Sequence, residues 1–341
     1  MLNNPDNSER IVPMSQFLSN CSADVLATAA QALKDGSLVA FPTETVYGLG
    51  ADAANAAAVA RIYGVKGRPS YHPLIVHIAD LKYLEQWIFE IPEYAIALAR
   101  ECWPGPMTLI LRRSELAKDF ITGGQNTVGI RIPNNVLALG LLEAFHKLGG
   151  AGIAAPSANR FGQVSPTTAE AVKEEIGEHL SETDLVLDGG PSAVGLESTI
   201  IDCTGDLPRI LRPGAITISM IEEVTGIEMS KSSSEQLNGS KEDKIRVSGS
   251  LENHYAPKAK VLLDQQPVIG SGFIALEEIQ SPDGVIRLAA PKSVEEFARV
   301  LYSALRDGDH QNLDFIYIAQ PTGEGLAIAI RDRLSRSAAG R

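Results

Sequence analysis

Apolar residues recur at helical spacing in several segments of the chain. Within 22–35, positions 25, 26, 29, 30 and 33 are apolar and share one face of a helix, which Gly36 ends. A second helix is predicted over 55–63, with Asn55 as its N-cap and Gly64 as its end. Further helices are predicted over 93–102, 136–148 and 167–177.

Short apolar runs separate these helices and predict buried strands. The alternation of strands and helices is typical of layered α/β proteins. The strand order does not follow from the pattern, and nothing requires a purely parallel sheet. The predicted strands cover 38–41, 74–78, 107–111, 128–132, 153–155, 185–187 and 199–201.

A change in composition divides the chain after about two thirds of its length. Residues 228–253 are rich in Ser, Lys, Glu and Gly and hold few apolar residues, as is typical of a linker that is at least partly flexible. Beyond it, a small α/β domain is predicted. Its strands are expected over 260–263, 272–276, 284–289 and 314–319, and its helices over 293–306 and 325–337.

The composition excludes several classes of protein. The 341 residues are 44% hydrophobic and carry 30 basic and 42 acidic side chains, so the net charge of −12 disfavours general polyanion binding. No apolar run approaches the roughly 20 residues of a membrane helix, and no signal peptide is visible. Three scattered cysteines fit a reducing compartment. We therefore expect a cytoplasmic protein without membrane contact.

The one local basic run lies near the C-terminus. We interpret it as a solvated helix end, stabilised by the helix dipole. It consists of Arg331, Arg333, Arg336 and Arg341.

Hydroxyl and glycine residues gather directly after the predicted strand at 38–41. Segment 42–50, PTETVYGLG, offers hydrogen-bonding side chains and close backbone approach at a strand end, where ligands of α/β proteins bind. Gly48, Gly50 and Ala53 also match the GxGxxA dinucleotide pattern. That match is weak, because six residues separate it from the strand and no acidic residue follows at the required distance.

Basic residues occupy the next loop and a later strand. Lys66 and Arg68 stand two apart in a Gly/Pro loop and suit phosphate oxygens. His77 lies in an apolar strand, where a core role and a ligand role both remain open. Arg131 lies in another apolar strand and requires an anionic partner, either a protein carboxylate or a ligand.

Two further loops are rich in hydroxyl and amide groups. Segment 154–167 holds Ser157, Asn159 and Ser165, which suit either a phosphate cradle or an N-cap. Segment 195–202 places hydroxyls at the start of a strand, and Arg212 ends the next. The sequence has no P-loop, no GxSxG elbow and no HExxH motif. The pattern therefore favours binding and orienting anions, as phosphoryl or nucleotidyl transfer requires.

Taken together and in order, these segments resemble the threonylcarbamoyl-AMP synthase family, over residues 24–226. The resemblance implies a twisted mixed sheet with helices in a YrdC-type catalytic domain over 1–227. The longer form of the family adds a linker that closes over the active site, here 228–259, and a smaller Rossmann-like α/β domain, here 260–341. The matching segments are PTETVYGLGADA (42–53), KGRP (66–69), PLIVHI (73–78), WPGPMTLIL (103–111), VGIRIP (128–133), APSANRFGQVSPT (155–167), LESTIID (196–202) and ILRPGAI (210–216).

The resemblance implies a reaction in which L-threonine, bicarbonate and ATP give threonylcarbamoyl-AMP and pyrophosphate. The product serves modification of the tRNA adenosine beside the anticodon. By the family's pattern, the threonine-binding residues are Thr43, His77, Arg131, Ala155, Ser198 and Thr199. The ATP-binding residues are Arg68, His72, Thr127, Ser157, Ser165, Arg212 and Tyr255. The residues expected to act in catalysis are Lys66, Arg68, Ser157 and Asn159.

The family also implies Mg²⁺ held through the ATP phosphates, with no protein metal site, and a downstream threonylcarbamoyl transferase complex as partner. Whether the protein also makes a weak direct contact with tRNA is left open. Two features depart from the family: His72 stands where Asn is common, and VSGSLEN precedes His254 in place of a more basic, aromatic segment. The alternatives are a double-stranded RNA or tRNA-binding module without catalysis and a carbamoyl transferase of the hydrogenase-maturation type.

Overall fold

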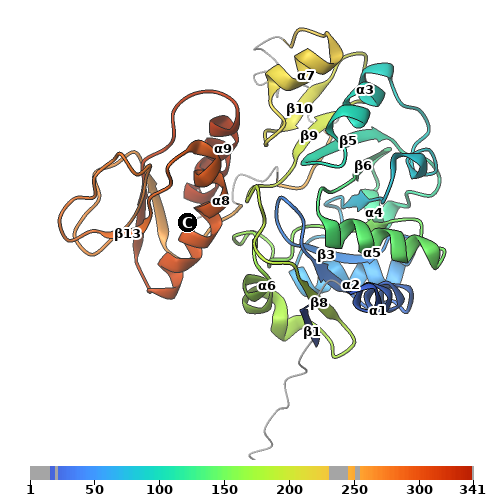
Figure 1. The fold of residues 1–341 in the computed structure, drawn as a ribbon, viewed down its shortest axis with the longest axis horizontal. Coiled ribbons are helices and arrows are strands. Elements are labelled where there is room, and N and C mark those ends of the chain that lie inside the picture. The colour runs from blue at the N-terminus through green and yellow to red at the C-terminus, as the bar shows by residue number, and fades with distance from the viewer. Residues whose placement is uncertain (1–15, 20–21, 230–244, 250–253, 340–341) are drawn as a thin grey trace, which may run out of the picture.

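The structure, a computed structural model, describes residues 16–19, 22–229, 245–249 and 254–339 (Figure 1). Its strands form two sheets. The first is mixed and contains ten of the described strands in the order β1-β8-β2-β3-β7-β4-β6-β5-β9-β10. The second has the order β11-β14-β12-β13, and each of its neighbouring pairs is parallel. The α/β class and the mixed character of the main sheet agree with the prediction.

The first sheet belongs to the part of the chain up to residue 229. Its strands are β1 (Gln16–Ser19), β2 (Val39–Phe41), β3 (Gly48–Asp52), β4 (Ile75–His77), β5 (Met107–Arg112), β6 (Thr127–Arg131), β7 (Ile153–Ala154), β8 (Leu185–Asp188), β9 (Thr199–Asp202) and β10 (Arg209–Arg212). Its helices are α1 (Ala23–Lys34), α2 (Ala56–Lys66), η1 (Leu81–Tyr83), α3 (Glu93–Cys102), α4 (Asp119–Thr122), α5 (Val136–Lys147), α6 (Ala169–Ile176), η2 (Gly177–His179) and α7 (Ile218–Thr225).

The helices begin where the sequence supplies side-chain caps. Ser22, Asn55, Asn135 and Thr168 each accept a hydrogen bond from a backbone N–H in the first turn of the helix that follows. These caps explain why the predicted helix starts are correct to within two residues.

The predicted end of the second helix is wrong. Helix α2 runs past Gly64 to Lys66, and it ends at Gly67, whose φ of 61° is left-handed. A glycine inside a helix costs only about 1 kcal/mol relative to alanine, whereas the left-handed C-cap favours glycine strongly. The longer helix brings Lys66 into its last turn.

Strand β3 replaces part of the predicted loop after residue 41. It pairs antiparallel with β2 and with β7. Gly50 has no room for a side chain, because a Cβ there would lie 2.8 Å from Cγ2 of Ile153 and 3.1 Å from the carbonyl oxygen of Val39. Gly50 therefore serves strand packing, and since Gly48 and Gly50 both lie in β3, no dinucleotide-binding turn from strand to helix exists at this point.

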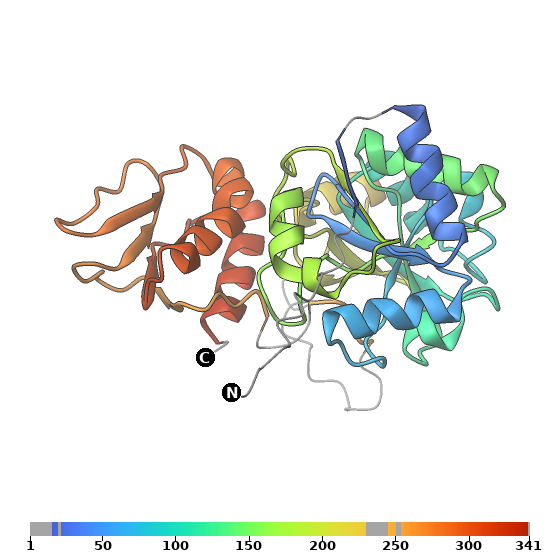
Figure 2. The same ribbon diagram turned by 90° about the horizontal axis from the view of Figure 1, so that it is seen from below.

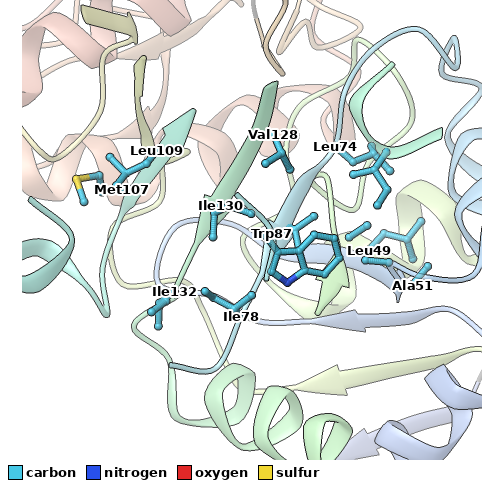
Figure 3. Packing of buried hydrophobic residues seen from close by; sticks show 14 of the residues in the cluster. Leu49, Ala51, Leu74, Ile78, Trp87, Met107, Leu109, Val128, Ile130 and Ile132 are labelled. Atoms are coloured by element: carbon cyan, nitrogen blue, oxygen red, sulfur yellow. The ribbon is translucent and has the colours of Figure 1, made fainter. Parts of the chain in front are cut away.

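The main core fills the space on one side of this sheet. Figure 3 shows Leu49 of β3, Ile130 of β6 and Leu109 of β5 among its members, with the ring of Trp87 at the centre of the labelled group. All four side chains are fully buried. A second cluster lies against α1 and α5 and includes Phe41 and Phe145. The two cores hold the strand ends that carry the loops predicted to be functional.

The C-terminal part forms a separate small layer. Its strands are β11 (Lys260–Leu263), β12 (Gly272–Ile274), β13 (Ile286–Ala289) and β14 (Phe315–Ile318), and its helices are α8 (Val294–His310) and α9 (Leu326–Ala338). They match the elements predicted there. Figures 1 and 2 show α8 and α9 between this sheet and the rest of the molecule, with α8 facing α6. Arg306 of α8 pairs with Glu175 of α6 at 2.7 Å.

The interpretation of the C-terminal arginines as a solvated helix end is wrong. The side chain of Arg333 is fully buried and pairs with Glu197 of the first part of the chain. Arg331 donates to the carbonyl oxygens of Pro321 and Gly323, and Arg336 pairs with Asp332. Arg341 lies outside the described residues. The face of α9 that carries Arg333 therefore packs inside the molecule, against the part of the chain that contains Glu197.

Two observations bear on the remaining predictions. Of the predicted linker, 230–244 and 250–253 lie outside the described residues, whereas Ser248, Gly249, His254 and Tyr255 are described. Throughout the described part of the chain, no helix has the length and apolarity to cross a lipid bilayer.

Candidate active site

One pocket collects the loops that the sequence singles out. Its walls come from the segment between β2 and β3, from β4 and β6, from the loop after β7, from the segment before β9, from the end of β10 and from the described part of the linker. Most of its lining residues lie at strand ends, where α/β proteins place their ligands. The lining consists of Thr43, Thr45, Val46, Tyr47, Gly48, Arg68, Ile75, His77, Arg131, Ala155, Pro156, Ser157, Glu197, Ser198, Arg212, Ser248, Gly249, His254 and Tyr255.

The segment after β2 is held by its own hydroxyl groups. Oγ1 of Thr43 donates to the carbonyl oxygen of Val46 at 2.6 Å and accepts from the backbone N–H groups of Thr45 and Val46. The backbone of Tyr47 then donates to Pro166 and accepts from Ala158. Thr43 is thus fixed in a tight turn, and this turn is joined by backbone hydrogen bonds to the 155–167 loop.

A buried ion pair joins Arg131, which lines the pocket, to Glu44, which does not. Arg131 ends β6, and its guanidinium lies 2.7 Å from the carboxylate of Glu44. The predicted need of Arg131 for an anionic partner is therefore met by a protein carboxylate. Nε of Arg131 has no hydrogen-bond partner among the described residues. The guanidinium thus retains donor capacity for a second anion.

His77 lies beside Arg131 in the parallel pairing of β4 with β6. Its ring is fully buried and meets the ring of Phe41 edge-on, with centroids 5.9 Å apart. Burial, aided by the positive charge of Arg131, lowers the pKa of His77 to about 3. The imidazole is therefore neutral at physiological pH, and within the described structure its Nδ1 has no hydrogen-bond partner.

Two more guanidinium groups line the pocket, and both bind the linker. Arg68 donates to the hydroxyl of Ser248, and Arg212 donates to the backbone carbonyl of Ser248, each at 2.9 Å. Arg212 also donates twice to the carbonyl oxygen of Ser198. Burial lowers the pKa of Arg68 to about 10 and that of Arg212 below its usual value, and both remain cations at neutral pH. The pocket therefore presents three arginines, Arg68, Arg131 and Arg212, to one space.

Lys66 and Asn159 lie behind the pocket wall and do not line it. Nζ of Lys66 donates to the carbonyl oxygens of Ser157 and Asn159. The amide of Asn159 donates to the carbonyls of Arg160 and Gln163, and the hydroxyl of Ser157 donates to Asn159 at 2.6 Å. Burial, followed by the neighbouring Arg68, lowers the pKa of Lys66 well below its usual value. In this conformation Lys66, Ser157 and Asn159 fasten the 157–163 loop to the end of α2.

The other predicted residues divide between the pocket and its surroundings. Ala155, Ser157, Ser198 and Tyr255 line the pocket. Ser165 is buried and donates to Glu197, which does line it. His72, Thr127 and Thr199 are not part of the lining: His72 packs between the rings of Tyr71 and Phe161, Thr127 begins β6, and Thr199 exchanges hydrogen bonds with the backbone of Ile216.

Several lining residues were not among the predicted site residues. Glu197 lies within a matched motif. Glu44, which pairs with Arg131 but does not line the pocket, also lies in one, and the need of buried Arg131 for an anion was a signal for it. Ser248 and Gly249 belong to a polar segment without a recognisable pattern, so no signal in the sequence indicates them. His254 stands directly before Tyr255 and has a pKa of about 3, lowered chiefly by burial.

Comparison with known proteins places this site in context. A family model described as "Telomere recombination" (Sua5/YciO/YrdC) matches residues 31–214. A second, described as "Threonylcarbamoyl-AMP synthase, C-terminal domain", matches residues 216–339. The two matches together span both sheets of the structure.

Individual proteins are similar over nearly the whole chain. Threonylcarbamoyl-AMP synthase of Bacillus subtilis is 40% identical over 335 residues, covering 93% of this chain and 93% of that protein. The protein of the same name from Pyrococcus abyssi is 39% identical over 333 residues, covering 91% and 92%. The crystal structure of P. abyssi Sua5 complexed with L-threonine superimposes with a TM-score of 0.83 at 37% identity, covering 96% of this chain and 98% of that one.

Proposed function

The chain belongs to the threonylcarbamoyl-AMP synthase family, and we propose that its three-arginine pocket is where L-threonine, bicarbonate and ATP become threonylcarbamoyl-AMP and pyrophosphate. The enzyme is a threonylcarbamoyl-AMP synthase, a transferase whose product serves tRNA modification. The observation that carries the assignment of the site is the convergence of Arg68, Arg131 and Arg212 on one hydroxyl-lined pocket.

Threonine binds, in this proposal, on the side of Arg131. Its carboxylate takes the unpartnered Nε edge of the Arg131 guanidinium, whose other side is held by Glu44. Neutral His77 and Thr43 line the same pocket together with Ala155 and Ser198, whereas Thr199, which we also assign to threonine, lies outside the lining. The pairing with Glu44 fixes the orientation of the guanidinium before threonine arrives, which lowers the entropic cost of binding.

ATP binds on the side of Arg68 and Arg212. Their charges stabilise the triphosphate and the negative charge that develops on pyrophosphate as it leaves. Ser157, whose loop is fastened by Lys66 and Asn159, and Tyr255 line the pocket there. His72, Thr127 and Ser165, which we also assign to ATP, lie outside the lining. We assign Lys66 and Asn159 the task of holding the loop in place, because their polar groups are bound to its backbone.

Magnesium enters as part of the nucleotide substrate. The described residues contain no cluster of three or more His, Cys, Asp or Glu side chains suited to a metal, and Glu197, the carboxylate that lines the pocket, is paired with Arg333. The phosphate oxygens of ATP therefore supply the anionic ligands for Mg²⁺. The metal adds charge neutralisation on the phosphates when bound.

The reaction depends more on the orientation of the substrates than on a nucleophile from the protein. The amine of threonine adds to bicarbonate with loss of water, or to carbon dioxide with loss of a proton, and gives N-carboxythreonine. The new carboxylate attacks the α-phosphorus of ATP in line, the bond to the β-phosphate oxygen breaks, and pyrophosphate leaves with that electron pair. Arginines on both sides hold the two anions together against their mutual repulsion.

We also propose a division of the chain into two domains and a linker. Residues 1–227 form the catalytic domain, 228–259 a linker that closes over the site, and 260–341 the C-terminal domain. Ser248, Gly249, His254 and Tyr255 line the pocket, and Ser248 bonds to two of its arginines, which supports the closing role. We also propose a cytoplasmic location, a downstream threonylcarbamoyl transferase as the acceptor of the product, and at most weak direct contact with tRNA.

A mass-spectrometric assay tests the proposal. Purified protein is incubated with ATP, Mg²⁺, bicarbonate and threonine, with parallel reactions that lack threonine or contain serine. A threonine- and bicarbonate-dependent adenylate with equimolar pyrophosphate is expected. Folded protein that binds ATP but forms no such product would contradict it. Salt-dependent RNA binding that ignores ATP and threonine would then favour an RNA-binding module.

A further inference from the structure

Glu197 receives hydrogen bonds from both parts of the chain. It lines the pocket, and its Oε1 accepts from the hydroxyl of Ser165 at 2.6 Å. Its Oε2 accepts from the hydroxyl of Tyr302 and from Nε of Arg333, each at 2.9 Å. Tyr302 lies on α8 and Arg333 on α9. A carboxylate in the wall of the pocket is therefore neutralised by the C-terminal domain.

The same two side chains also reach the linker. The guanidinium of Arg333 lies 5.4 Å from the ring centre of Tyr255, and the rings of Tyr255 and Tyr302 are stacked with centroids 5.8 Å apart. Arg333 donates in addition to the carbonyl oxygen of Pro213, next to Arg212. All four of Arg333, Tyr302, Tyr255 and Glu197 are buried. These contacts form one continuous group between the two helices and the pocket wall.

The charges explain what this group does. Burial alone would raise the pKa of Glu197, but Arg333, Arg212 and the Ser165 hydroxyl outweigh it and lower the pKa to about 2. Glu197 therefore carries a full negative charge in the wall of a pocket meant for anions. Arg212 interacts electrostatically with the same carboxylate. Without Arg333, Arg212 would be the remaining cation to neutralise Glu197.

We propose that Arg333 and Tyr302 are positioning residues for the reaction: they hold and neutralise Glu197, and thereby leave Arg212 available for the phosphates of ATP. This inference rests on the proposed function of the pocket. It gives the C-terminal domain a defined task, because α8 and α9 supply the counter-charge that the catalytic domain lacks at this position.

The decisive variant is Arg333→Met, which removes the charge and keeps much of the apolar volume. The KM for ATP should rise about tenfold or more, with kcat and the KM for threonine changed less than about threefold. Adding Glu197→Gln to Arg333→Met removes the uncompensated carboxylate and should bring the KM for ATP back to within about threefold of wild type. Arg333→Lys keeps the charge, and its KM for ATP should lie between those of wild type and Arg333→Met.

Arg306→Met is the matched control. Arg306 is a partly buried arginine of α8 that pairs with Glu175 and donates to the carbonyl oxygen of Val164 across the same interface, and none of these three residues lines the pocket. This variant should lose thermal stability as Arg333→Met does, yet keep the wild-type KM for ATP. If Arg333→Met does not fold, Tyr302→Phe decides, since it removes only the hydroxyl bound to Glu197. Its KM for ATP should rise about twofold to fivefold at a Tm near that of wild type.

Three results would overturn the inference: an unchanged KM for ATP in folded Arg333→Met or Tyr302→Phe, an equal rise in Arg306→Met, or no recovery in the double variant. Failure of the proposed function is distinguishable from these. In that case wild-type protein itself makes no threonylcarbamoyl-AMP, while calorimetric titration with MgATP still compares the nucleotide affinities of the variants.

Discussion

The guanidinium of Arg131 lies 2.7 Å from the carboxylate of Glu44, and both side chains are buried. Such a pair contributes little net stability compared with apolar residues, but losing one partner leaves an expensive buried charge. In this protein Arg131 lines the pocket, and its Nε has no hydrogen-bond partner among the described residues, so it can donate to a second anion. Stability and substrate binding therefore depend on the same residue in separable ways.

Replacing Arg131 by Met is expected to lower the free energy of unfolding by about 3–5 kcal/mol, because Glu44 loses its partner. It should also weaken threonine binding at least about tenfold, because the guanidinium fork is lost. The double variant Arg131→Met, Glu44→Gln should recover most of the stability and none of the threonine binding. Denaturant titration and threonine calorimetry measure the two effects. Threonine binding by the double variant at wild-type affinity would exclude Arg131 as the carboxylate site.

Acid should destabilise the protein through its buried histidines. The pKa values of His77 and His254 are about 3 in the folded protein, chiefly through burial, against about 6.5 in the unfolded chain. The unfolded state therefore binds more protons below pH 6.5. The stabilising contribution is complete above pH 6.5 and is lost progressively as the pH falls toward 3, by about 1.4 kcal/mol per pH unit for each histidine.

Unfolding free energies between pH 7.5 and 4.5 test this expectation. His77→Gln should reduce the slope below pH 6 by about 1.4 kcal/mol per unit, because it removes one of the histidines whose pKa is lowered by burial, while His72 and His254 still titrate. The exposed His179 provides the control, and His179→Gln should leave the slope as it is in the wild type. Identical slopes in wild type and His77→Gln would show that His77 is protonated in the folded state.

Lys66→Ala is expected to reduce kcat by about two orders of magnitude or more, while the protein remains folded. The variant leaves two carbonyl oxygens of the 157–159 segment without their donor, so the loop loses its attachment to α2. Steady-state kinetics and circular dichroism give the two readouts. Lys82→Ala, at an exposed position, is the control and should be unaffected. A fully active Lys66→Ala enzyme would contradict the role assigned to Lys66.

Gly195 tests how closely the two domains approach. A Cβ at this position would lie 2.5 Å from Cα of Arg299 and 2.6 Å from the carbonyl oxygen of Ala298, both in α8. Gly195→Ala should therefore push α8 away, lower the Tm and raise the KM for ATP through Glu197. Gly190 has a similar positive φ, 74° against 81°, and open space around it. Gly190→Ala carries the same backbone strain without the collision, so equal effects in both variants would rule out interdomain contact as the cause.

Hydrophobic periodicity predicted the helices well where one face of the helix is buried and the other is exposed. Helices α1, α5 and α8 have caps and apolar faces in the sequence, and their predicted starts are close to those observed. Strand β3 was missed because glycines at 48 and 50 have no side chain to show alternation. The reason for a glycine at position 50 is visible only in the fold, where Ile153 and Val39 leave no room for a side chain.

The site was predictable to the extent that its residues lie in recognisable segments. Thr43, Arg68, Arg131 and Ser157 were expected near one another, and all line the pocket. Arg333 was misinterpreted because a basic residue near a helix end is usually solvated, and its partner Glu197 lies 136 residues earlier. No local pattern encodes a contact of that kind. The same holds for Ser248, which is identified only by the two arginines that bind it.

The strand order has a consequence for the protein during its synthesis. Strand β8 lies between β1 and β2, and β9 adds to β5, so segments made late complete neighbours made early. Chains emerge from the ribosome N-terminus first. The ten-stranded sheet therefore cannot be completed before residue 212 has been synthesised. Glu197 can contact Arg333 only when synthesis of the chain is nearly complete. A nascent chain therefore holds Arg68, Arg131 and Arg212 before it holds Arg333, the counter-charge of Glu197.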